Sequence, residues 1–169
     1  MRRFIALALL AAACASGSRA TLQPADAATS LIVGERMTMA ENASGGGEGQ
    51  DPLVLLTLTH ADGRAMQFEE ANHAPMDLVV QSADGALAQV MGLFGGETPR
   101  LFRPRGGAAF LCGEEGPAAL GLYEAADGAV TIVGLRSGFQ VETRDDGGYE
   151  TLPYSPDQVC ARLRLQRSR

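Results

Sequence analysis

The sequence predicts a mainly β protein of the α+β class, with a small antiparallel sheet or barrel, one or two short helices and one disulfide. Three observations support this prediction. Short apolar runs alternate with Asp-Gly turns, two segments space their apolar residues as helices do, and two cysteines lie in the second half of the chain. The predicted globular domain covers residues 31–169.

The first twenty residues have the layout of a bacterial export signal. Arg2 and Arg3 precede an apolar run, residues 4–13, and small residues follow it. Ten helical residues rise only about 15 Å, half of a bilayer core of about 30 Å, so this run is too short to span a membrane. Because Cys14 directly follows three alanines, the segment resembles a bacterial lipoprotein signal, in which such a cysteine is acylated and becomes the new N-terminus.

This resemblance implies a signal peptide over residues 1–13 and a lipidated Cys14 that holds the protein in the cell envelope, facing the periplasm. The outer membrane is favoured because Ala15 stands where retained inner-membrane lipoproteins carry aspartate. A second cleavage site stays open. Cleavage after Ala20 would follow the ordinary small-x-small pattern and release a soluble periplasmic protein without Cys14.

Two stretches lack any apolar period. Residues 14–30 are small and polar, so we expect them to form a flexible tether that carries the lipidated cysteine, with the domain starting at Leu31. Residues 42–52, NASGGGEGQDP, predict a glycine-rich loop. Their glycines lack the GK[ST] ending of a phosphate-binding loop.

A first hairpin is predicted around the turn that contains Gly63. The flanking runs are residues 53–59 and 64–70. A three-residue loop places Leu58 opposite Met66 and keeps one face of the hairpin apolar, whereas a two-residue loop would not. We therefore predict the three-residue loop, with Gly63 in the left-handed region.

Two further hairpins are predicted in the second half of the chain. Residues 119–125 and 129–135 flank an Asp-Gly turn, and a two-residue loop there would pair Leu122 with Val133. The third hairpin turns at residues 145–148, which are DDGG.

Two segments predict helices. Residues 84–96 space their apolar side chains at i, i+3, i+4 and i+7 and end in a glycine pair, although a strand that pairs with residues 78–80 remains an alternative. Residues 155–164 begin with Ser155 as a potential N-cap and Pro156 at the first helical position.

The cysteines predict one bridge. If Cys14 is acylated, the remaining Cys112 and Cys160 form an even pair in an exported domain, which is typical of a disulfide. This bridge would attach the helix predicted over residues 155–164 to a strand. No CxxC motif or Cys/His cluster accompanies the pair, so we predict no metal and no cofactor.

Catalytic signals are few. His73 lies in FEEANHAPMD with several carboxylates, and a periplasmic hydrolase or metal-dependent enzyme that uses this region is an alternative interpretation. His60 ends a strand opposite Arg64, and a neighbouring cation makes it a poor base or ligand. No GxSxG, HExxH or GxGxxG motif is present, so we predict no catalytic residues and no enzyme activity.

The charges exclude one class of partner and suggest another. Without Arg2 and Arg3, 12 of the 14 basic residues remain against 20 acidic ones, a net charge of about −8, which opposes nucleic-acid binding. Because the predicted bridge limits the distance between two arginine-rich stretches, we predict one anion-binding patch made of Arg100, Arg103, Arg105, Arg162 and Arg164. A basic tail plus a solvated loop is the alternative.

The function predicted from these features is a lipid-anchored, non-catalytic binding or scaffolding module of the cell envelope. Its expected partners are the membrane, through the acyl anchor on Cys14, and an anionic envelope component or an envelope protein. A further alternative is a protein inhibitor, because small disulfide-bonded β lipoproteins that inhibit lysozyme are similar in size and location.

Overall fold

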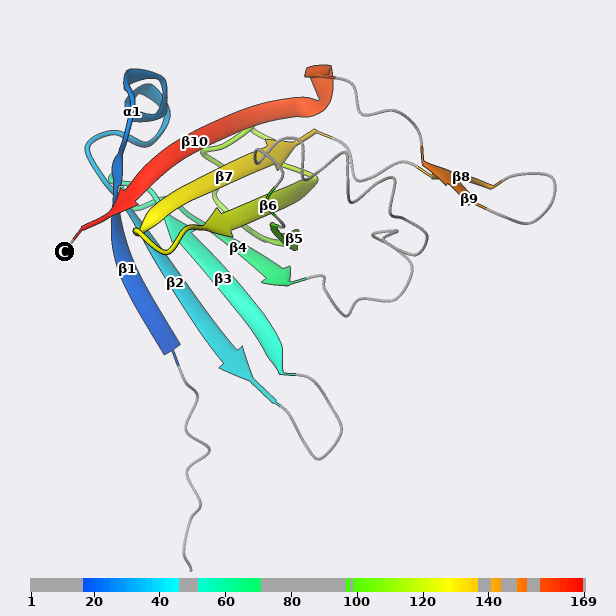
Figure 1. Ribbon diagram of the computed structural model, residues 1–169, viewed down its shortest axis with the longest axis horizontal. Helices are drawn as coiled ribbons and strands as arrows, with labels where there is room; N and C mark the ends of the chain where they lie inside the picture. Colours follow the sequence, from blue (N-terminus) through cyan, green and yellow to red (C-terminus); the bar gives the residue numbers. More distant parts are fainter. Residues whose placement is uncertain are drawn as a thin grey trace, which may run out of the picture.

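Eight strands close into an antiparallel barrel in the order β1-β10-β7-β6-β5-β4-β3-β2 (Figure 1). The computed structural model describes residues 17–45, 52–70, 97, 99–136, 141–143, 149–151 and 156–168. The barrel strands are β1 (Gly17–Pro24), β2 (Met37–Ser44), β3 (Leu53–Thr59), β4 (Ala65–Glu70), β5 (Arg100–Gly107), β6 (Ala119–Glu124), β7 (Ala129–Leu135) and β10 (Val159–Arg167). The prediction of a mainly β fold is confirmed.

The remaining elements are short. Helix α1 (Ala27–Val33) connects β1 to β2. Strands β8 (Val141–Thr143) and β9 (Tyr149–Thr151) form a separate two-stranded sheet between β7 and β10 in the chain. A single 3-10 turn, η1 (Pro156–Gln158), leads into β10. Apart from this insertion, neighbouring strands in the barrel are consecutive in the chain, except where β10 closes on β1, so the topology is up-and-down.

The prediction that residues 14–30 form a flexible tether is wrong from residue 17 onward. Strand β1 pairs with β2 over six residues and with β10 near its end, and α1 follows it. Leu22 is the one fully buried side chain of β1, so side-chain burial contributes little to its stability. Backbone pairing with the neighbouring strands holds it in place. Both ends of α1 are capped: the Asp26 carboxylate accepts a hydrogen bond from the Thr29 N–H at 2.7 Å, and Gly34 follows the helix.

The first predicted hairpin is confirmed. Leu58 lies opposite Met66 and Leu56 opposite Phe68, and Gly63 has a φ of 93°. The apolar face chosen from the sequence points into the barrel, where these four side chains are almost fully buried.

The predicted register of the β6–β7 hairpin is wrong by one residue. Leu122 lies opposite Ile132 rather than Val133. The loop has three residues, because the Ala125 N–H donates to the Ala129 carbonyl at 2.8 Å and leaves the ADG sequence of residues 126–128 between them. The ADG sequence between β3 and β4 forms a three-residue loop in the same way. Both faces of β7 are largely buried, so the apolar pattern could not distinguish the registers.

The helix predicted over residues 155–164 is wrong. Its start signals produce η1 alone, and β10 follows. From Ala161 the chain alternates between buried apolar residues and exposed polar ones, which is a strand period. The third predicted hairpin is present as β8 and β9. The helix predicted over residues 84–96 lies outside the described residues.

Side chains fill the middle of the barrel, and its two ends differ. The buried core includes Phe68, Phe102, Leu120 and Ile132. At the end that holds α1 and the β5–β6 connection, Val33 and Leu111 are buried in the same core. We call the opposite end, where β1 begins at Gly17 and β2 ends at Ser44, the mouth. Charged residues replace the apolar core as the strands approach it.

Candidate functional site

A layer of inward-facing charged side chains lies just inside the mouth. Each member continues an alternating row of buried residues on its own strand, as Glu41 continues Met37 and Met39 on β2. The others follow the same rule on β4 and β5. Glu41, Glu70 and Arg100 are in contact near the mouth, and we call these three residues the polar layer. Glu124 and Arg167 form a separate pair, where β10 reaches Leu22 of β1.

Arg100 crosses the barrel interior to join strands that are not neighbours. Its Nε and Nη2 donate to the two carboxylate oxygens of Glu70 at 2.7 and 2.8 Å, a bidentate contact. Its Nη1 lies 2.9 Å from both oxygens of Glu41, which stands on β2 with β3 and β4 between it and β5. Its guanidinium carbon also lies 5.1 Å from the centre of the Phe102 ring.

These contacts fix the charge state of Arg100. Hydrogen bonds to Glu70, and then to Glu41, raise the pKa of Arg100 above its already high usual value, although partial burial opposes them. The side chains are 35% exposed for Arg100, 18% for Glu41 and 12% for Glu70, so this ionic cluster is shielded from water but open on one side. A second pair, Arg167 with Glu124, joins the last strand to β6.

A pocket of about 280 Å³ opens at the mouth beside the polar layer. Gly17, Ser18, Glu41, Ala43 and Val54 line it, from β1, β2 and β3. Small residues on β1 and β2 leave this space, and Glu41 is the charged side chain among these lining residues. The pocket therefore combines an apolar wall with one carboxylate that is already held in place by Arg100.

A second ionic cluster lies on the outside of the barrel. Glu69 is 8% exposed and faces outward from β4. Its Oε1 accepts a hydrogen bond from Arg103 at 2.6 Å. Its Oε2 lies 2.6 Å from Arg105 Nε but has no hydrogen-bond partner among the described residues. This contact is therefore an ion pair in which the N–H of Arg105 does not point at the carboxylate oxygen.

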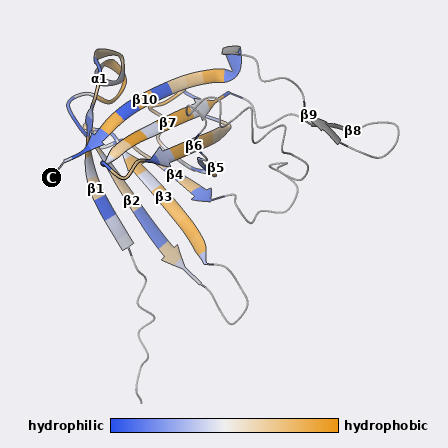
Figure 2. Ribbon diagram, in the orientation of Figure 1, coloured by the Kyte–Doolittle hydropathy of each residue, from blue (hydrophilic) through white to orange (hydrophobic). Residues whose placement is uncertain are grey.

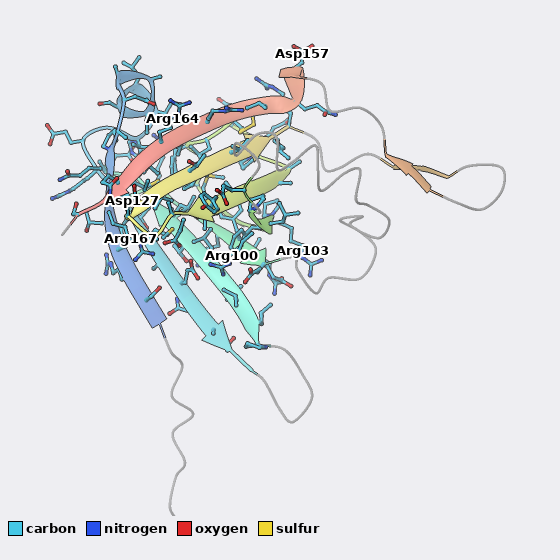
Figure 3. The ribbon with its side chains drawn as sticks, viewed as in Figure 1. Arg100, Arg103, Asp127, Asp157, Arg164 and Arg167 are labelled. Atoms are coloured by element: carbon cyan, nitrogen blue, oxygen red, sulfur yellow. A yellow bond between two sulfur atoms is a disulfide. The ribbon has the colours of Figure 1, made fainter. Side chains whose placement is uncertain are left out.

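The predicted anion-binding patch is not formed as one surface. β5 and β10 are separated by β7 and β6, and Figure 3 shows Arg164 well away from Arg100 and Arg103. Arg100 points into the barrel, whereas Arg103 and Arg105 lie against Glu69 outside it. Arg162 and Arg164 are exposed on the outer face of β10. The bridge holds the two cysteines close together, but the arginines lie in three separate places: inside the barrel, against Glu69 on its outer face, and on the outer face of β10.

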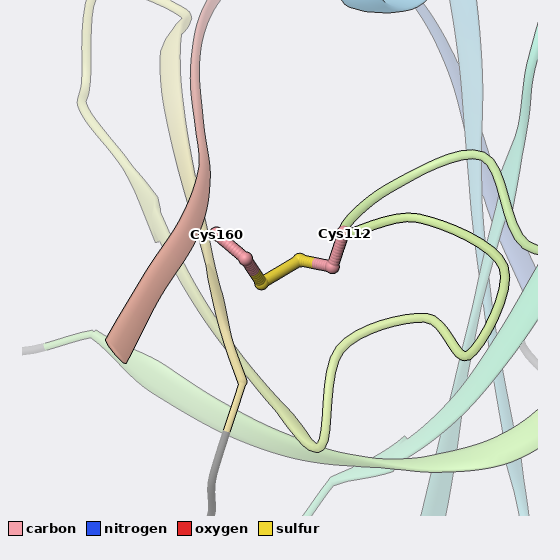
Figure 4. The surroundings of a disulfide bond; sticks show 2 residues. All are labelled: Cys112 and Cys160. Carbon is pink, nitrogen blue, oxygen red and sulfur yellow. A yellow bond between two sulfur atoms is a disulfide. The ribbon is translucent and has the colours of Figure 1, made fainter. Parts of the chain in front are cut away.

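The predicted disulfide is present. Cys112 and Cys160 are bonded, with their Cα atoms 4.9 Å apart, and the bond joins the start of β10 to the β5–β6 connection (Figure 4). Because residue 160 is in a strand, the bridge does not hold a helix as predicted. The bond packs over Gly134 of β7, where an added Cβ would lie 2.8 Å from the sulfur of Cys112.

Of the two histidines, His60 lies in the described part of the chain, at the turn between β3 and β4. His60 Nδ1 accepts a hydrogen bond from the backbone N–H of Asp62, and its ring lies 5.3 Å from that of Phe110. His73 lies outside the described residues. Within the described part of the chain, no group of three or more His, Cys, Asp or Glu residues is arranged to hold a metal ion.

The comparisons with known proteins give no relative: no family model matches the chain, and neither a curated protein nor a solved structure is detectably similar. Among the described residues, no helix has both the length and the apolar character needed to cross a membrane. Cys14 lies outside the described residues.

Proposed function

We propose that this protein is exported, acylated at Cys14 and used as a non-catalytic binding module of the cell envelope. The observation that carries this proposal is the position of β1, which begins at Gly17, three residues after Cys14. Cleavage after Ala20 would remove half of β1 and break its pairing with the end of β2. Cleavage before Cys14 leaves the whole strand in the mature protein.

The barrel supports binding rather than chemistry in this proposal. Eight-stranded barrels have an interior that side chains just fill, or that holds one small ligand, and mouths of barrels are common ligand sites. Here apolar side chains form the core in the middle, and a pocket lined by described residues lies at the mouth. The carboxylate that lines this space is paired with Arg100, an arrangement suited to holding a polar group in a fixed position.

The experiment that tests the proposal is mass spectrometry of the mature N-terminus, combined with acyl labelling in a bacterial host. We expect an acylated N-terminus at Cys14 and no labelling of a Cys14→Ser variant. An inhibitor of lipoprotein signal peptidase should block maturation of the natural sequence. A mature N-terminus at Thr21 would contradict the proposal and would also require a barrel that lacks half of its first strand.

A further inference from the structure

We propose that the pocket at the mouth binds the primary ammonium group of a phospholipid headgroup, with Glu41 as its counter-ion. This inference rests on the proposed acylation of Cys14, which places the mouth against the membrane. The pocket itself is built from described residues of β1, β2 and β3 and does not depend on that proposal.

The short connection to the anchor determines which end of the barrel faces the lipid. Only Ala15 and Ser16 separate Cys14 from β1. Three residue steps span at most about 11 Å, and the headgroup region of one leaflet is roughly 5–8 Å thick. Acyl chains on Cys14 would therefore hold Gly17 at the headgroups, with α1 at the far end of the barrel.

The polarity of the mouth fits this position. β3 begins there with Leu53, Val54 and Leu55, and Figure 2 shows this end of the strand in the hydrophobic colour. The adjoining end of β2 carries Asn42 and Ser44, both exposed. This part of the mouth, on β2 and β3, presents apolar and uncharged polar side chains together, which suits the boundary between headgroups and acyl chains.

The pocket selects for a cation that can donate hydrogen bonds. A carboxylate offers about four acceptor positions, and Glu41 uses its two oxygens for one nitrogen of Arg100. Acceptor capacity therefore remains on Glu41, which is one of the residues that line the pocket. A primary ammonium has three N–H donors, whereas the quaternary ammonium of phosphatidylcholine has none. Ala43 and Val54 provide the apolar wall for the methylene groups next to the nitrogen.

The membrane, rather than a free amine, is the expected source of this group. A single, partly exposed ion pair contributes little binding energy by itself, so a soluble amine would occupy the pocket weakly. An anchored barrel meets headgroups at a high effective concentration, and this compensates for weak intrinsic binding.

The test uses isotope-labelled, acylated protein in lipid nanodiscs and follows the backbone amide signals of Ser18, Ala43 and Val54. We expect these signals to shift when phosphatidylethanolamine replaces phosphatidylcholine. Glu41→Gln keeps an acceptor for Arg100 but removes the charge, and Ala43→Leu fills the pocket. Each variant should weaken the response to phosphatidylethanolamine about tenfold, the factor that corresponds to about 1.4 kcal/mol.

Glu35→Gln is the matched control, because Glu35 is exposed in the connection from α1 to β2, at the far end of the barrel. It removes the same charge and should leave the response unchanged. Identical spectra in the two lipids, or shifts that survive both pocket variants, would overturn the proposal.

A final experiment distinguishes a lipid headgroup from a soluble amine as the ligand. It also distinguishes failure of the pocket proposal from failure of the proposed acylation of Cys14. Free ethanolamine is titrated into protein that carries Cys14→Ser and is exported by an ordinary cleavable signal. Shifts as large as those in nanodiscs, at millimolar ethanolamine, would assign the pocket to soluble amines and overturn the lipid source. An acylated N-terminus with no lipid-dependent shift refutes the pocket alone, whereas an N-terminus at Thr21 refutes the anchor.

Discussion

Removal of the Cys112–Cys160 bond should destabilise the barrel by about 4 kcal/mol. The bond closes a chain segment with a sequence separation of 48, and loop-closure entropy for that length gives this value at 25 °C. Cys112→Ala, Cys160→Ala and the double variant should lose similar amounts, because each breaks the same link. Urea unfolding under non-reducing conditions measures the differences, and free thiols on both residues in protein purified without reductant would refute the bridge.

Gly134 extends this prediction to the packing around the bond. An alanine Cβ there would lie 2.8 Å from the Cys112 sulfur, but 3.4 Å or more from the other nearest atoms. Gly134→Ala should therefore be costly in the natural sequence and much less costly beside Cys112→Ala, where the sulfur is absent. Cys160→Ala is the matched control, because it breaks the bond but keeps that sulfur. An equal cost of Gly134→Ala in all three backgrounds would refute this packing argument.

Three further changes test other contacts. Arg100→Met should lower the free energy of unfolding, measured in urea, by about 2–3 kcal/mol. This is less than the roughly 3–5 kcal/mol expected for breaking a fully buried pair, because the Arg100 side chain is 35% exposed. Adding Glu41→Gln to this variant should recover part of the lost stability, because it removes a carboxylate that has lost its partner. Thr29→Val should cost about 1–3 kcal/mol, because the buried Thr29 hydroxyl accepts from the Arg164 N–H at 2.9 Å, whereas Thr29→Ser should cost less. The hydrogen bond from the Arg64 backbone N–H lowers the pKa of Asp62 to about 2. The ionised Asp62 therefore stabilises the fold above about pH 4, and this contribution is lost as the pH falls towards 2. In thermal unfolding, Asp62→Asn should lose less stability in acid than the natural protein does.

The parts of the fold that could be predicted are those where one face of a strand is polar. In the β3–β4 hairpin, a single register buries Leu58 and Met66 together, so the pattern determines the pairing. In the β6–β7 hairpin, Val133 faces outward and is still buried, so two registers are equally apolar and the turn residues decide between them. The start of β10 resembles a helix in the sequence, because Ser155 and Pro156 are typical of a helix N-terminus. In the structure, residues 156–158 form a single 3-10 turn and the strand follows.

The candidate site was harder to predict than the fold. The disulfide followed from the number of cysteines and the expected compartment, and it is present. Glu41 and Glu70 each end an alternating apolar row, which in a sequence looks like a strand running out into solvent. Their meeting at Arg100 depends on closure of the barrel, which brings β2 and β5 face to face across the interior. No local pattern carries that information.

The pairing of β1 with β10 also bears on how the barrel folds. Leu22 lies opposite Arg167 in this pairing, so the ring of strands closes through a contact between residues that are far apart in the sequence. Contacts between such distant positions form slowly. Even in the closed barrel, residues 17–20 pair with β2 alone, because the pairing of β1 with β10 covers only Leu22, Gln23 and Pro24. Closure of the ring therefore depends on β10, whereas the first residues of β1 depend on their pairing with β2.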